Sequence, residues 1–227
     1  MRKGLLIAAV LTALATGVQA QETALFFERG VTKAAARQFE KALVEFQNAL
    51  FKYDAAADGS GLLLAKINYN IGVCHYRLGR ASQAADHFSR AVGGDPRYEK
   101  AHYALGMAYA DLGKLAEAKN AFLAALAIGG GRSGETWFDL GLVELRMSEP
   151  RAAAESFANA IRYGTRSPAE ARNNIGVAAA MRSDHVEAEL QFRLALAESG
   201  GKLLEAKRNL ELIRSTAAGD GLIAARR

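Results

Sequence analysis

Cysteine and histidine are the residue types in this chain that could supply a nucleophile, a general base or a metal ligand. Cys74 and His75 are adjacent, and the other histidines are His87, His102 and His185. If their segment YNIGVCHYRLGR is helical, adjacent side chains point about 100° apart, so Cys74 and His75 do not form a nucleophile–base pair. We therefore expect no catalytic site here, and Cys74 is predicted to be a small buried residue.

The spacing of the histidines does not indicate a metal site either. His75 lies three residues after one recurring glycine, and His102 lies four residues before the next. On parallel neighbouring helices they would be separated by about seven residues of rise, roughly 10 Å. His87 and His185 fall on second helices or turns as lone residues. The expectation is no metal, no cofactor and no enzymatic activity.

The segment around Cys74 is one copy of a recurring unit. YALGMAYADLGK, FDLGLVELRMSE and NNIGVAAAMRSD share its frame. The chain aligns on glycines separated by 42, 34, 35 and 35 residues: Gly30, Gly72, Gly106, Gly141 and Gly176. Twelve, sixteen and nineteen residues after each glycine stand alanine, phenylalanine and alanine: Ala42, Phe46, Ala49; Ala84, Phe88, Ala91; Ala118, Phe122, Ala125; Ala153, Phe157, Ala160; Ala188, Phe192, Ala195.

This pattern predicts a helical hairpin in each unit. One apolar-periodic helix holds the glycine, a short polar turn such as Gly79-Arg80 or Ser183-Asp184 follows, and a second helix carries the Ala-Phe-Ala series. Glycine costs about 1 kcal/mol inside a helix, so its recurrence indicates that two backbones approach closely there. The phenylalanine ring is expected to fill the space between neighbouring helices.

At this point the sequence resembles the tetratricopeptide repeat family. The period near 34, the apolar residue before the glycine, the Ala-Phe-Ala series and a closing Pro96 match its pattern over residues 23–200. The family's tryptophan, four residues before the glycine, is kept only as Trp137; the other units have Phe26, Asn68, His102 and Arg172. Its tyrosine, three residues after the glycine, is kept only as Tyr109; the other units have Lys33, His75, Glu144 and Ala179.

The resemblance implies an all-α fold, a right-handed α-solenoid of five helix-turn-helix repeats with a C-terminal capping helix. The repeats are predicted at about 23–53, 65–98, 99–133, 134–168 and 169–200. A loop is expected at YDAAADGSG between the first two repeats. After residue 200, Leu203, Ala206, Leu210 and Ile213 share one face of an expected helix that covers the last repeat. The end of residues 201–227 is predicted to be a mobile basic tail.

The N-terminus reads as an export signal. Arg2 and Lys3 precede the apolar run GLLIAAVLTALATG, and Val18-Gln19-Ala20 is a small-residue cleavage site. We therefore predict a signal peptide over residues 1–20, cleavage near Ala20, and a periplasmic or secreted protein. The run is short for a bilayer span, and an uncleaved N-terminal membrane anchor is the alternative.

Charge is balanced in the body of the chain. Residues 21–200 hold 21 basic and 21 acidic side chains, although the whole sequence carries a net charge of +5. Phosphate binding needs an excess of lysine and arginine on one face, so nucleic acid is not the expected partner. The single cysteine cannot form an internal disulfide.

The resemblance also implies where a partner binds. In this family the first helices line a concave surface, and residues three before, two before and one after the glycine project into it. The residues predicted to bind a peptide are therefore Phe27, Tyr69, Asn70, Val73, Tyr103, Met107, Phe138, Leu142, Asn173, Asn174 and Val177.

The chemistry of these residues favours a protein partner with an apolar segment, bound as an amphipathic helix or an extended strand. Asparagine amides can pair with a peptide backbone, which resembles part of the family's asparagine ladder, although Ala104 and Asp139 interrupt it. The family's carboxylate clamp is not matched, because Phe27, Tyr69 and Tyr103 replace its basic residues. The alternative for the aromatic stripe is plain core packing.

The resulting hypothesis is a non-catalytic scaffold that binds a peptide or helix in its concave groove and assists assembly or regulation of a cell-envelope complex. No small-molecule substrate is expected. The first alternative is a self-associating repeat protein that forms homo-oligomers, with the groove not the main site. An enzyme using dispersed groups is the second, and no sequence feature argues for it.

Overall fold

The computed structural model describes residues 2–53 and 61–217, with side chains from residue 18 to residue 215 outside the gap. Within these residues it is all-helical, which confirms the predicted fold class. The helices are α1 (Arg2–Ala35), α2 (Phe39–Lys52), α4 (Leu62–Arg77), α5 (Ala81–Gly94), α6 (Glu99–Asp111), α7 (Leu115–Ile128), α8 (Gly134–Arg146), α9 (Pro150–Arg162), α10 (Pro168–Met181), α11 (His185–Glu198) and α12 (Leu204–Ala217).

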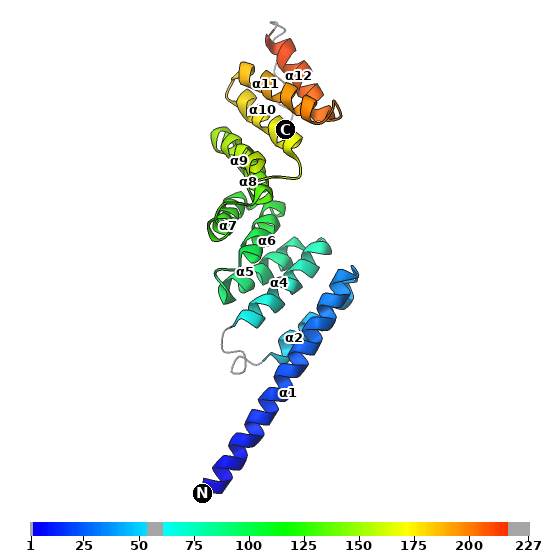
Figure 1. Ribbon diagram of the computed structural model, residues 1–227, viewed down its shortest axis with the longest axis vertical. Coiled ribbons are helices and arrows are strands. Elements are labelled where there is room, and N and C mark those ends of the chain that lie inside the picture. Colours follow the sequence, from blue (N-terminus) through cyan, green and yellow to red (C-terminus); the bar gives the residue numbers. More distant parts are fainter. Residues whose placement is uncertain (1, 54–60, 218–227) are drawn as a thin grey trace. The chain divides into compact units, whose positions relative to one another are not determined.

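The chain divides into two compact units, residues 1–114 and residues 115–227. In unit 1, α1 packs on α2 and α4 packs on α5, and α6 follows against α5 (Figure 1). In unit 2, α7 packs on α8, α8 on α9, α10 on α11, and α12 on both α10 and α11. Within each unit, helices that follow one another in sequence therefore pack against one another.

Four repeats close by a contact between their glycine and their phenylalanine. A Cβ atom placed at Gly30, Gly72, Gly141 or Gly176 would lie only 2.5, 2.7, 2.9 or 2.6 Å from the phenylalanine ring sixteen residues later. The rings are buried, with at most 2% of Phe46, Phe88, Phe157 and Phe192 exposed. The glycine is thus required by the close approach of a ring to the first-helix backbone, and not by the predicted approach of two backbones.

The turn between the two helices of a repeat has the same backbone geometry throughout. Seven residues after each glycine the chain turns left-handed, with φ of 58° at Arg37, 73° at Gly79 and Gly113, 59° at Ser148 and 61° at Ser183. The next amide donates to the carbonyl five residues back, for example from Arg80 to His75 at 2.9 Å. This is the Schellman arrangement that ends many helices.

Helix α12 continues the register of the repeats. Ala206, Leu210 and Ile213 are buried, and they stand 35 residues after three side chains of α10. Leu210 and Ile213 join the core formed by Ala179, Ala188 and Phe192, so α12 covers the last repeat as predicted. Its counterpart to the repeat glycine is Glu211, which is exposed.

The remaining predictions about organisation concern the chain ends and the first connection. The predicted export segment and the first helix of repeat one form one continuous helix, α1. Among the described residues, no helix combines the length and apolar character that a membrane span needs. Most of the expected loop, residues 54–60, and most of the expected tail, residues 218–227, lie outside the described residues.

Candidate protein-binding surface

The predicted binding residues of unit 1 lie on its three first helices. Helix α4 contacts both α1 and α6, so these helices are neighbours. We call the side chains three before, two before and one after each glycine the first-helix surface. In unit 1 it comprises Phe27, Glu28, Val31, Tyr69, Asn70, Val73, Tyr103, Ala104 and Met107, of which Glu28 and Val31 are exposed and the rest are partly buried.

The aromatic residues of this surface rest on the buried phenylalanines. The ring centroids of Phe27 and Phe46 are 5.7 Å apart, and those of Tyr69 and Phe88 are 5.8 Å apart, in tilted contacts. Tyr69 also meets Tyr98, the residue immediately before α6, at 5.0 Å. Each ring therefore packs against the core and keeps part of its area at the surface. Core packing and partner binding are compatible for these side chains.

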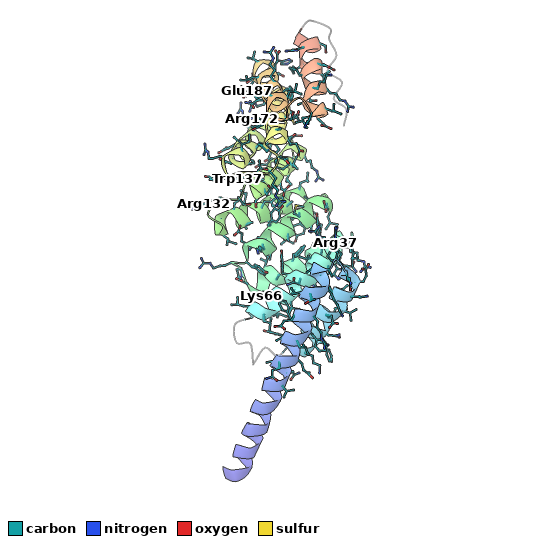
Figure 2. The ribbon with its side chains drawn as sticks, turned by 45° about the vertical axis from the view of Figure 1, so that its right-hand side comes forward. Arg37, Lys66, Arg132, Trp137, Arg172 and Glu187 are labelled. Atoms are coloured by element: carbon teal, nitrogen blue, oxygen red, sulfur yellow. The ribbon has the colours of Figure 1, made fainter. Side chains whose placement is uncertain are left out.

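Unit 2 has the same arrangement in its first complete repeat. Phe138 on α8 meets Phe157 on α9 edge to face, with 5.5 Å between ring centroids. Leu142, one residue after the glycine, is 37% exposed, and Val177 on α10 is partly buried. Trp137, labelled in Figure 2, donates its indole N–H to the Gly131 carbonyl at 2.8 Å.

The predicted asparagines differ in how far the fold already uses them. Asn173 is only 8% exposed; its amide nitrogen donates to Asn174, and its oxygen accepts from Asn209 of α12 at 3.0 Å. Asn70 donates to the Lys66 carbonyl of its own helix at 2.8 Å and is partly exposed. Asn70 and Asn174 are therefore better placed for a partner than Asn173.

Asn209 was not among the predicted residues. It stands 35 residues after Asn174, which is two residues before the repeat glycine Gly176. In α12 the residue that corresponds to this glycine is Glu211, and Asn209 is two residues before it. The signal that finds it is the continuation of the repeat register into residues 204–217.

The prediction that His87 is a lone residue is wrong. Its ring stacks on that of His75, with 5.6 Å between centroids and 16° between planes, and its Nδ1 lies 3.1 Å from Oδ1 of Asn68. Burial lowers the pKa of His75, and the Arg80 charge adds to the effect. Burial, together with the charges of Arg90 and His75, lowers the pKa of His87 to about 4. Both rings are thus neutral near pH 7.

The position three after the glycine meets the position fifteen after it in other repeats too. Lys33 pairs with Glu45 in repeat one, and Ser156 donates to the buried Glu144 carboxylate at 2.7 Å in repeat four. The histidine pair is repeat two's version of this contact. Comparing the residues three and fifteen positions after each glycine would have identified His87 as the partner of His75.

Cys74 is fully buried, as predicted, and burial raises the pKa of its thiol to about 11, so it is a thiol at neutral pH. Within the described part of the chain, no three histidine, cysteine or acidic side chains are grouped so that they could hold a metal ion.

Known proteins share this architecture of paired helices. Tetratricopeptide repeat models match residues 25–99 and 138–202, and a second such model matches residues 75–133. These matches span more than half of the sequence. The chain belongs to the tetratricopeptide repeat family, whose members are generally non-catalytic scaffolds that bind protein or peptide partners.

Solved structures agree with this assignment at the level of the fold. The crystal structure of MamA superposes with a TM-score of 0.70 at 22% identity, covering 81% of this chain and 94% of MamA. YrrB, described as a TPR protein with an unusual peptide-binding site, gives 0.72 at 18% identity, covering 86% and 95%. A tetratricopeptide repeat protein from Parabacteroides merdae gives 0.71 at 17%, covering 88% and 76%. No curated protein matches the sequence.

Proposed function

We propose that this chain binds a peptide or helix of a partner protein on its first-helix surface, through an apolar segment of the partner. The observation that carries the proposal is the pair of half-buried rings, Phe27 and Tyr69, seated on buried phenylalanines of neighbouring repeats. A ring fixed by the core loses little conformational freedom on binding, which favours its use as an anchor.

Alanine substitutions at Tyr69 and Tyr103 test this surface. Each shortens a partly exposed aromatic side chain on a first helix of unit 1. We expect the affinity for an apolar peptide to fall while the helical circular dichroism signal is kept. Unchanged affinity in an intact fold would mean that these rings serve packing only.

We further propose that the protein acts after export, in assembly or regulation of a cell-envelope complex. The N-terminal Arg2-Lys3, the apolar run and the Val18-Gln19-Ala20 site support this. Cell fractionation with N-terminal sequencing should give a mature chain starting near Gln21. A membrane-bound chain that starts at Met1 would favour an uncleaved anchor. Crosslinking in the native envelope would then identify the partner.

Self-association is the second candidate, and a feature of α11 favours it. Val186, Leu190 and Leu194 recur at helical spacing and are 84%, 48% and 39% exposed, opposite the face that carries Phe192. Sedimentation across a concentration series discriminates the two functions. A stable oligomer that Leu190→Lys dissociates would favour self-association over the first-helix surface as the main site.

A further inference from the structure

Two lysines border the first-helix surface of unit 1. Lys66 on α4 and Lys100 on α6 both stand six residues before their glycine, and both are exposed (Lys66 is labelled in Figure 2). The contact of Tyr69 with Tyr98 brings the start of α6 beside α4, three residues beyond Lys66 and two before Lys100. Because the two lysines occupy the same register position on neighbouring first helices, they stand at the same end of the first-helix surface.

Lys66 and Lys100 have no acidic partner within the described residues, unlike Lys33 and Lys52. Lys33 pairs with Glu45, and Lys52 pairs with Glu22 at 2.8 Å. By contrast, the described ion pairs include neither Lys66 nor Lys100. Glu99 is next to Lys100 but points about 100° away around the helix. The positive end of the α6 dipole adds to the local potential.

The same position carries the opposite charge in unit 2. Glu135 and Glu170 stand six residues before Gly141 and Gly176. Glu135 accepts the backbone N–H of Arg166 at 2.8 Å and pairs with its guanidinium. The lysines are therefore a property of unit 1 and not of every repeat.

We propose that the unit 1 surface selects a partner segment in which aspartate or glutamate side chains adjoin the apolar stretch. This rests on the proposed function, since the apolar stretch is the part that lies on Phe27, Tyr69 and Tyr103. The acidic side chains lie over Lys66 and Lys100, and Asn70 stands one turn further along α4. Glu28, at the level of Asn70 on α1, disfavours acids deeper on the surface, which confines them to the lysine end.

The test uses the full chain and short peptides that are acetylated and amidated, so that no terminal charge remains. The peptides share one leucine- and phenylalanine-containing centre and carry aspartates, serines or lysines on one side. We expect the aspartate peptide to bind most tightly, with affinity that falls as salt is added. The Lys66→Glu, Lys100→Glu double variant should bind it about tenfold more weakly or worse.

Lys41→Glu is the matched control, because Lys41 is an exposed lysine of unit 1 on a second helix. It should leave the affinity unchanged. Two results together would overturn the acidic preference and keep the proposed surface. The serine peptide would bind the original chain but not Tyr69→Ala, and the aspartate peptide would bind the lysine double variant as tightly as the original chain. Binding that requires a free C-terminal carboxylate in place of aspartates would also overturn it. No binding by any of these peptides would count against both proposals.

Discussion

Repeat two, formed by α4 and α5, and repeat four, formed by α8 and α9, share one contact between their two helices and differ in the pair of side chains beside it. In both, a phenylalanine ring lies against a glycine, Phe88 on Gly72 and Phe157 on Gly141. Three residues after the glycine the chemistry diverges. Repeat two places His75 against His87, whereas repeat four places a carboxylate, Glu144, against a hydroxyl.

The difference teaches that the repeat geometry depends on few positions. Glu144 is 4% exposed and is held by Lys119 of α7 in addition to Ser156, and His75 is 6% exposed. The Glu144 carboxylate has a hydrogen bond and an ion pair, whereas His75 is held by ring stacking and its buried Nδ1 has no hydrogen-bond partner among the described residues. The glycine–phenylalanine contact is the same in both repeats. The pair of side chains three and fifteen residues after the glycine differs between them.

The largest expected effect comes from removing the shared ring. Phe88→Ala and Phe157→Ala should each lower the free energy of unfolding by about 3–5 kcal/mol, because each leaves a cavity at a site with almost no exposure. Urea unfolding followed by circular dichroism measures both. The two losses should be similar; a loss below about 1 kcal/mol in either repeat would refute the common closure.

Adding a methyl group at the glycine should cost less. Gly72→Ala and Gly141→Ala bring a Cβ atom to 2.7 and 2.9 Å from the ring, and overpacking of this kind costs about 1–3 kcal/mol. Gly93→Ala is the control, because Gly93 lies in α5 with open space around its Cβ position. There the better helix propensity of alanine should stabilise the protein by up to about 1 kcal/mol. Stabilisation by all three changes would exclude steric closure.

The histidine pair should make repeat two, and not repeat four, sensitive to acid. The pKa of His87 is lowered to about 4 in the folded chain, while an unfolded histidine titrates near 6.5. The unfolded state therefore binds more protons in this window, and stability is lost as pH falls from about 6.5 towards about 4. Because the His87 ring is only partly buried, we expect a loss of about 1–2 kcal/mol, less than the unscreened shift implies.

The matched control for the pH effect comes from repeat three, which has Tyr109 and Ala121 at the equivalent positions. A His75→Tyr, His87→Ala double variant should lose this pH dependence, while the titration of carboxylates at lower pH remains in both proteins. Identical stability–pH curves for the two proteins would show that the stacked rings do not titrate as inferred.

The sequence predicted the parts of this comparison that repeat and missed the parts that differ. The glycine, alanine and phenylalanine columns recur five times, so one physical rule explains them all. His87 and Asn68 each occur once at their positions, and the contact between them depends on which side chain faces them from the other helix. The first-helix positions were predictable from the register, whereas the commitment of Asn173 to α12 depended on tertiary packing.

The smallest expected effect concerns the turn, where repeat two has Gly79 and repeat four has Ser148 at the same left-handed position, with φ of 73° and 59°. A residue with a Cβ atom costs about 1–2 kcal/mol in this conformation, and glycine avoids this strain but loses more backbone entropy on folding. Ser148→Gly should therefore increase the free energy of unfolding by about 0.5–1 kcal/mol and raise the melting temperature slightly. Gly79→Ser should lower both by a similar amount. Differential scanning calorimetry of both variants and of the double swap measures the effect.

Because the two turns lie in different units, the changes should add, so that the double swap returns close to the original stability. A swap that is far from neutral would mean that one of these turns carries a constraint beyond its backbone angle, and the equivalence of the two repeats would then hold for the closing contact alone.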